Sequence, residues 1–274
     1  MKSCLLLALF LLSLLCFAQK SKKITPPGTV KINDTLFIDK TEVANIHWRE
    51  YLLYLNDIRK DSFAYEKALP DTLVWIEDSM YNYYINYYFR HPSTNNNPVT
   101  GVSYEQAVEF CNWRTFAANQ ADYFKEKKIK DYRGHLQDNF PVRYYYRLPT
   151  KGEWEMAALG GVDSLVSVYG GVEESFPNRC CYYNTKNYWE HINSNRKEGD
   201  KVVEFRLFSS QFLFPNKFGM YTYIGNVAEM VAEKGIAKGG SFIHNLEDCK
   251  ITNNQYYTKP ERWLGFRCVA VIVR

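Results

Sequence analysis

The residues with the greatest chemical capability lie in the last quarter of the chain. There a Gly-Gly-Ser run ends at Ser241 and is followed by His244 and Cys249. Thiolate is a soft metal ligand and imidazole also binds transition metals, so residues of these types could hold a metal ion. In the alternative interpretation Cys249 is a small buried residue, His244 is a polar loop residue and Ser241 supports the glycine turn. The residue types alone leave both interpretations open.

The start of the chain is typical of a secretory signal over residues 1–18. An apolar run over residues 5–15 is followed by Ala18, which closes a small-residue cleavage site. Neither this run nor any later segment reaches the roughly 20 apolar residues that cross a membrane. Cys16 raises the alternative of lipidation, but Leu15 stands where a lipidation signal has a small residue. We expect an exported, soluble and extracytoplasmic mature chain.

The composition points to a protein or glycan partner. The net charge of +4 is small for 274 residues and argues against nucleic acid. Aromatic residues make up 16% of the chain, with 22 tyrosines, and such side chains supply contact area at low entropic cost. The other interpretation is that they fill a core that is poor in regular secondary structure.

Removal of the signal leaves five cysteines, which are Cys111, Cys180, Cys181, Cys249 and Cys268. In an oxidising compartment an odd number means that at least one thiol is free, modified or paired between chains. The adjacent pair at positions 180 and 181 is a poor candidate for an internal bond, because the ring it would close is strained.

Local patterns divide the chain into a leader over residues 19–28, which is basic and proline-rich, and one domain over residues 29–274. Apolar residues at alternate positions predict a strand pair within 29–39. Phe37 interrupts this alternation, which is expected if the second strand is buried on both faces. A helix is predicted over 45–56, with Asn45 as its N-cap.

Two further helices carry stronger signals. Ser103 with Gln106 predicts one capping box, and Thr150 with Glu153 predicts another, whose helix ends at Gly160. Residues 118–140 are polar and are expected to form a surface excursion between these helices. Beyond residue 162 we expect loops and short strands.

Several motifs, in this order, resemble the formylglycine-generating enzyme (sulfatase-modifying factor) family from about residue 28 to the end. They are residues 36–43 (Leu-Phe-Ile-Asp-Lys-Thr-Glu-Val), 97–104 with 110–114, 147–155 around Arg-Leu-Pro-Thr, 225–229 (Gly-Asn-Val-Ala-Glu), 238–242 (Lys-Gly-Gly-Ser-Phe) and 264–268 (Leu-Gly-Phe-Arg-Cys). The resemblance implies an α+β fold related to C-type lectins, in a single domain with little regular secondary structure.

The same resemblance implies a catalytic site with two cysteines five residues apart, which hold copper. Here the second position is Cys249, but the first is His244, and Ser241 lies beside the implied pocket. A mixed pair would bind copper more weakly than two thiolates. Copper is therefore not expected, and the oxidase that converts a sulfatase cysteine to formylglycine is the alternative to a non-catalytic protein.

The resemblance also implies a calcium site and a disulfide. Its calcium ligands fall on Thr222, Gly225, Val227 and Glu229, where hard oxygen donors suit Ca²⁺. The alternative is that Glu229 is hydrogen-bonded within a tight loop. The implied disulfide joins Cys111 to Cys268, closing a long loop.

A narrower resemblance involves residues 68–75 (Ala-Leu-Pro-Asp-Thr-Leu-Val-Trp) and 87–92 (Tyr-Tyr-Phe-Arg-His-Pro). These segments are similar to segments of the gliding-motility and type IX secretion lipoproteins of Bacteroidetes, which carry the same domain as a structural part of envelope machinery. The sequence therefore favours a non-catalytic binding or scaffold component of the bacterial cell envelope. Its partners would be envelope proteins or exported polypeptides, or a glycan.

Overall fold

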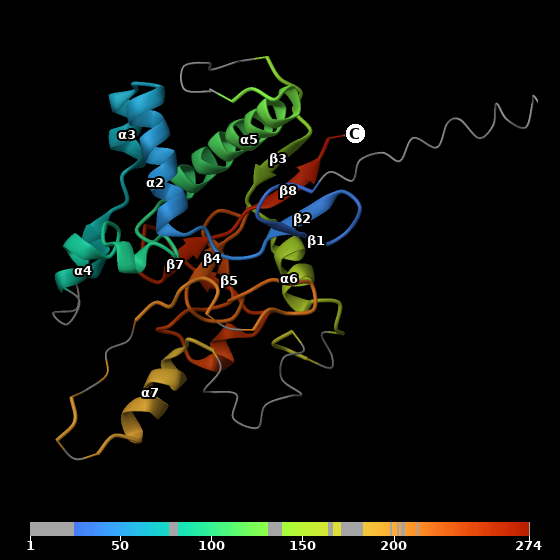
Figure 1. Cartoon of the computed structure of the whole chain (residues 1–274). Helices are drawn as coiled ribbons and strands as arrows, with labels where there is room; N and C mark the ends of the chain where they lie inside the picture. The colour runs from blue at the N-terminus through green and yellow to red at the C-terminus, as the bar shows by residue number, and fades with distance from the viewer. Residues whose placement is uncertain are drawn as a thin grey trace, which may run out of the picture.

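A computed structural model describes residues 25–76, 82–130, 139–163, 167–170, 183–197, 199–201, 203, 206–212 and 214–273. The predicted signal peptide, most of the leader, Cys180 and Cys181 lie outside the described residues. The described part is a mixed α and β domain in which two small sheets are surrounded by helices and long loops (Figure 1).

Each sheet has four strands. The first has the order β1 (Thr29–Lys31), β2 (Leu36–Asp39), β8 (Val269–Ile272) and β3 (Tyr144–Arg147), and all its pairs are antiparallel. The second has the order β6 (Gln255–Tyr256), β5 (Ile236–Lys238), β4 (Ala228–Met230) and β7 (Leu264–Phe266), with β4 and β7 parallel. Both ends of the domain thus meet in the first sheet, because β8 pairs with β2.

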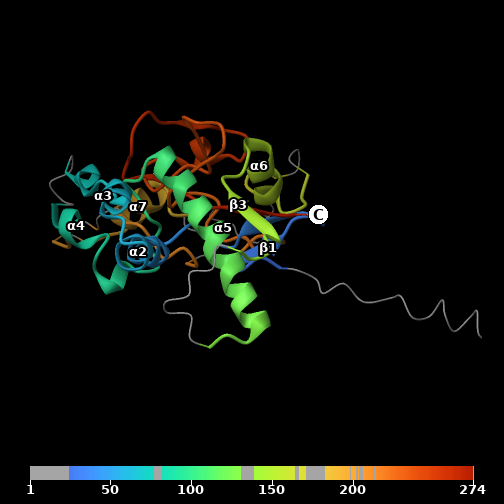
Figure 2. The same cartoon turned by 90° about the horizontal axis from the view of Figure 1, so that it is seen from above.

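The α-helices are α2 (Asn45–Leu53), α3 (Ser62–Ala68), α4 (Asn82–Tyr87), α5 (Tyr104–Lys127), α6 (Lys151–Leu159) and α7 (Lys186–Ser194). Shorter helical turns are η1 (Tyr54–Ile58), η2 (Thr72–Trp75), η4 (Pro92–Thr94) and η7 (Leu246–Cys249). The long helix α5 packs across β3, as the view from above shows (Figure 2).

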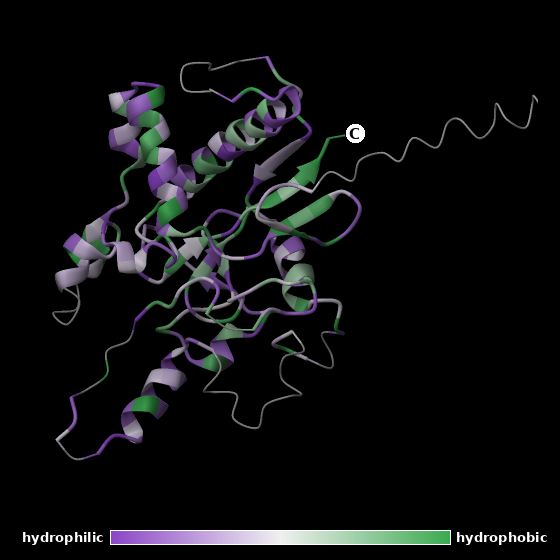
Figure 3. Cartoon of the chain, in the orientation of Figure 1, coloured by the Kyte–Doolittle hydropathy of each residue, from purple (hydrophilic) through white to green (hydrophobic). Residues whose placement is uncertain are grey.

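The predicted strand pair and both capping boxes are confirmed. All four residues of β2 are buried, which explains why Phe37 interrupts the alternation. β8 is hydrophobic along its length, and β2 is hydrophobic up to its last residue, Asp39 (Figure 3). Ser103 and Thr150 accept hydrogen bonds from Gln106 and Glu153 at the starts of α5 and α6.

Three local predictions were wrong. The N-cap of α2 is Ala44, because the Asn45 side chain instead donates to two distant carbonyls in the 88–94 segment. The surface excursion predicted from residue 118 is helical as far as Lys127, because Asn119 hydrogen-bonds β3 at the main-chain carbonyl of Tyr144 and so ties the helix to the sheet. α7 was also missed beyond residue 162.

The main core lies between α2, α5 and the sheets. Trp48 of α2 stacks on Phe110 of α5, with ring centroids 5.3 Å apart, and meets Phe266 of β7 edge to face. These rings are almost fully buried. Aromatic side chains therefore form much of this core. Core filling was one of the two interpretations of the high aromatic content, and a binding surface was the other.

Candidate functional site

The glycine run before Ser241 is shaped by the packing of Cys249. Gly239 and Gly240 both have positive φ, which glycine adopts without strain. A Cβ at Gly240 would lie only 2.1 Å from the Cys249 Sγ. The run therefore needs glycine so that the loop can pass directly over this sulfur.

Ser241 and His244, two of the residues that the resemblance assigned to a catalytic pocket, are brought together. The Ser241 Oγ lies 2.7 Å from the His244 Nδ1, and the imidazole meets the Trp263 ring edge to face at 5.1 Å. Burial lowers the pKa of His244 below its ordinary value, against a smaller opposite effect of the Asp248 carboxylate. A neutral imidazole hydrogen-bonded to a serine follows from this arrangement.

Cys249 faces the interior. Its Sγ donates to the main-chain carbonyl of Asn245 at 3.2 Å, and the residue is fully buried. Burial raises the pKa of this thiol to about 12, so it is protonated at neutral pH. Binding of a metal by Cys249 would require the thiol to lose this proton and its hydrogen bond to the Asn245 carbonyl. Within the described residues, no cluster of three or more His, Cys, Asp or Glu side chains could hold a metal ion.

Glu229, the central residue of the predicted calcium site, is paired with a cation that the chain itself supplies. Both of its carboxylate oxygens accept from Arg267, at 2.5 Å from Nε and 2.6 Å from Nη2. Trp154 Nε1 donates to the same carboxylate at 2.6 Å. The remaining Arg267 N–H groups donate to main-chain carbonyls of Asp39, Lys40 and Tyr221. The guanidinium is thus fully enclosed and neutralises Glu229.

A second carboxylate, missed at the sequence level, completes this buried ionic centre, which we define as Glu42, Glu229 and Arg267. The Thr222 Oγ1 is hydrogen-bonded to Glu42 and also lies 3.0 Å from the Ser210 carbonyl oxygen. Asn226 Nδ2 donates to Glu42 at 2.9 Å. Glu42 lies three residues after the end of β2, within the family motif at residues 36–43, and that position was its signal in the sequence.

Burial raises the pKa of Glu42 to about 7, against the opposite effect of Arg267, and the charge of Glu229 raises it further. The hydrogen bonds agree with a neutral Glu42. A threonine hydroxyl has one proton but two acceptor oxygens beside it. A protonated Glu42 could donate to Thr222, which would then donate to the Ser210 carbonyl. Thr222 and Asn226 hold these positions with positive φ, at 46° and 61°.

The two side chains among the predicted calcium ligands, those of Glu229 and Thr222, already have other partners in this arrangement. The Glu229 oxygens are both engaged with Arg267, and the Thr222 hydroxyl is engaged with Glu42. A calcium ion at Glu229 would have to displace the guanidinium, so the tight hydrogen-bonded loop is the interpretation that this geometry favours.

Cys111 and Cys268 lie side by side, with their Sγ atoms 3.5 Å apart and both thiols free. Burial raises the pKa of Cys268 well above its ordinary value, and the neighbouring thiol adds to this effect. A disulfide between them stays a prediction. Among the helices that can be described, none combines the length and apolar character that a bilayer crossing demands.

Comparison with known proteins identifies the fold and the family. CarF, a solved structure, aligns with a TM-score of 0.50 at 21% identity over 87% of each chain, which shows a shared fold. The chaperone protein LppX of Paenibacillus barcinonensis is 26% identical over 184 residues, covering 57% of this chain and 62% of the relative. The inactive C-alpha-formylglycine-generating enzyme 2 of Bos taurus is 30% identical over 191 residues, covering 63% and 50%.

The chain therefore spans between half and two thirds of the length of the curated relatives that it matches. The model of the sulfatase-modifying factor enzyme 1-like domain matches residues 13–272, which is nearly the whole chain. The chain belongs to this sulfatase-modifying factor (FGE-sulfatase) family.

Proposed function

We propose that this protein is a non-catalytic member of its family that binds polypeptides, as a binding or scaffold component of the bacterial cell envelope after export. The observation that carries the proposal is the state of the only cysteine in the implied copper pair. Cys249 is buried, donates its proton to a carbonyl and has a pKa of about 12. Its expected partner position holds His244, whose imidazole is hydrogen-bonded to Ser241.

The names of two relatives agree with this proposal. One relative is called an inactive formylglycine-generating enzyme and another is called a chaperone protein, and these two names support the two parts of the proposal separately. The envelope location rests on the signal-like N-terminus and on the resemblance to gliding-motility and type IX secretion lipoproteins. The alternative function is the formylglycine-generating oxidase.

An activity assay separates the two functions. Purified protein receives Cu(I), oxygen and a sulfatase peptide that contains Cys-x-Pro-x-Arg. We expect the peptide cysteine to remain unmodified in mass spectra, because the implied copper site holds one cysteine and one histidine in place of two cysteines. Formylglycine formed over multiple turnovers by the wild-type protein would overturn the proposal.

The variant His244→Cys is the matched control for this assay. It supplies the second thiol, so tighter Cu(I) binding by the variant than by the wild type would attribute the missing chemistry to position 244. The binding role is tested separately by co-purification from native envelope with chemical cross-linking. A scaffold should bring defined envelope proteins with it, and recovery of the chain alone at native expression level would count against that role.

A further inference from the structure

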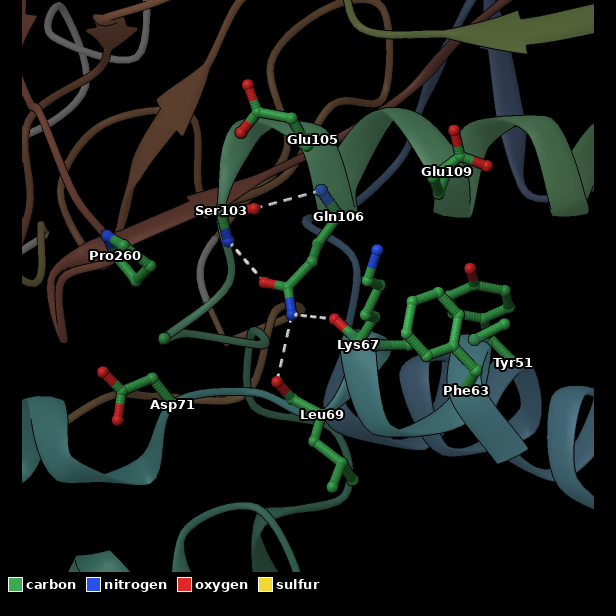
Figure 4. A pocket seen from close by; sticks show the side chains of 13 residues that line it. Tyr51, Phe63, Lys67, Leu69, Asp71, Ser103, Glu105, Gln106, Glu109 and Pro260 are labelled. Atoms are coloured by element: carbon green, nitrogen blue, oxygen red, sulfur yellow. Dashed lines mark hydrogen bonds between the residues drawn. The ribbon is translucent and has the colours of Figure 1, made fainter. Parts of the chain in front are cut away.

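A groove lies on the opposite side of α5 from β3, between α3 and the first turns of α5. It has a volume of about 620 Å³, within the range of roughly 300–1,000 Å³ typical of ligand sites. Its walls come from α2, α3, α5 and Pro260, and none of its lining residues belongs to the 222–249 segment discussed above. We call it the α3–α5 groove (Figure 4).

Gln106 holds the base of this groove in a fixed shape. Its Oε1 accepts from the main-chain N–H of Ser103 at 2.7 Å. Its Nε2 donates to the carbonyls of Lys67 and Leu69, at 2.8 Å and 3.0 Å, where α3 ends (Figure 4). One amide therefore joins the start of α5 to the end of α3 with all its hydrogen bonds made. A site built on two helices joined in this way is preorganised.

The charges along the groove are predominantly negative. Asp71, Glu105 and Glu109 contribute three carboxylates, and Lys67 contributes one cation, whose Nζ lies 4.2 Å from the centroid of the Phe63 ring. Lys234 reaches Glu105, but both side chains of this pair are 63% exposed, so the pair is weak. Among the described residues Glu109 has no ion-pair partner.

Apolar side chains accompany these carboxylates. Phe63 is 68% exposed although it lines the groove, and Tyr51, Ala68 and Leu69 lie beside it. Burial, and to a lesser degree the Glu109 carboxylate, raise the pKa of Tyr51 to about 12, so its hydroxyl remains a neutral donor. The exposed Phe63 ring beside the Glu109 carboxylate therefore places apolar surface and an unpaired negative charge at one point of the groove.

We propose that the α3–α5 groove docks an extended polypeptide segment that carries a lysine or arginine next to an aromatic or aliphatic side chain. The inference rests on the proposed polypeptide-binding function and names the chemistry of the partner. The carboxylates complement the basic side chain, and Phe63 with Leu69 covers the apolar one. Nucleic acid is disfavoured because its phosphates would meet three carboxylates. A neutral glycan would leave them unpaired, and Lys67 already covers one face of Phe63.

The experiment measures binding of labelled peptides to the full chain by fluorescence anisotropy. The probe is fluorescein-labelled Gly-Ser-Arg-Phe-Lys-Ser-Gly, compared with the same peptide in which both basic residues are glutamate. We expect the basic peptide to bind about tenfold more tightly or better than the acidic one, with affinity falling as salt is raised. A neutral oligosaccharide, maltohexaose, is added as competitor and should not displace the peptide.

Two groove variants and two matched controls locate the site. Glu109→Lys and Phe63→Ser should each weaken binding of the basic peptide by about tenfold. Glu66→Lys, on α3 but outside the groove, and Leu73→Ser, an exposed apolar residue of η2, should leave it within about twofold. All four positions are exposed, so the variants are expected to fold.

The outcomes separate the groove from the proposed function. Peptide binding that is unchanged in both groove variants would contradict docking in the α3–α5 groove, and so would an equal loss of binding in the Glu66→Lys control. Either result would leave the proposed polypeptide-binding function intact. Displacement of the peptide by maltohexaose, or no binding of the basic peptide, would also contradict docking of a basic peptide in the groove. The oxidase assay and the envelope co-purification judge the proposed function independently, because neither uses these variants.

Discussion

The carboxylates of Glu42 and Glu229 lie in the interior, whereas those of Glu105 and Glu109 lie on the surface of α5. The buried pair is 0% and 1% exposed. Glu229 is paired with the enclosed cation of Arg267, and Glu42 is hydrogen-bonded to Thr222 and Asn226. The surface pair has a single lysine partner, on Glu105, among the described residues.

This difference separates charges that hold the fold from charges that remain available for binding. Removing one partner of a buried ion pair leaves an uncompensated charge and costs about 3–5 kcal/mol. Changing an exposed charge usually alters stability by no more than about 0.5 kcal/mol. The buried ionic centre should therefore respond to mutation in unfolding experiments, and the α3–α5 groove should respond in binding experiments.

The largest expected effect concerns the cross-link next to the buried centre. If Cys111 and Cys268 are oxidised after export, the bond joins residues 157 positions apart and stabilises the fold by about 4–5 kcal/mol in the chain-entropy model. Non-reducing peptide mapping should recover the linked peptides, and Cys268→Ser should lower the melting temperature of oxidised protein. Recovery of both thiols alkylated in the native protein would show that no bond forms.

Removal of the buried cation comes next in size. Arg267→Met leaves the buried Glu229 carboxyl group without its cation and should lower the free energy of unfolding in urea by about 3–5 kcal/mol. Glu109→Lys is the surface control and should change it by no more than about 0.5 kcal/mol. Similar losses in both variants would erase the distinction between the two regions.

Glu42 makes stability depend on pH. Its pKa is about 7 in the folded protein against 4.5 as the ordinary value, so the folded state keeps a proton that the unfolded state has lost between these pH values. Stability therefore falls as pH rises from about 4.5 to about 7, by about 3 kcal/mol, and is flat above that window.

Glu42→Gln should remove this dependence, because glutamine stays neutral and can hydrogen-bond to the same two side chains, Thr222 and Asn226. Urea unfolding of both proteins at several pH values between 4 and 8 measures the difference. An identical pH profile in the variant would assign the dependence to another group.

The smallest expected effect is that of calcium. A free site would stabilise the fold by about 2.7 kcal/mol at a hundredfold excess of calcium over its dissociation constant. Because Arg267 occupies both oxygens of Glu229, we expect the same unfolding curve in chelator and in millimolar calcium. A shift that Glu229→Gln abolishes would show that calcium displaces the guanidinium.

Local structure was predictable where short-range chemistry decides it. The capping boxes at Ser103 and Thr150 need only a hydroxyl and an acceptor three residues later, and both form. The continuation of α5 beyond residue 118 was missed because Asn119 is anchored by β3, which follows it in sequence. The groove was missed for a similar reason, since it joins α3, α5 and Pro260.

The sequence by itself determined the family, the motif positions and the presence of Ser241, His244 and Cys249 near one another in the chain. It could not determine their chemistry, because protonation depends on burial and on partners from distant segments. Only the tertiary structure encloses Cys249 beneath Gly240 and brings Arg267 to Glu229. Low local dielectric and fixed hydrogen-bond donors then decide which charges are already neutralised and which can meet a partner.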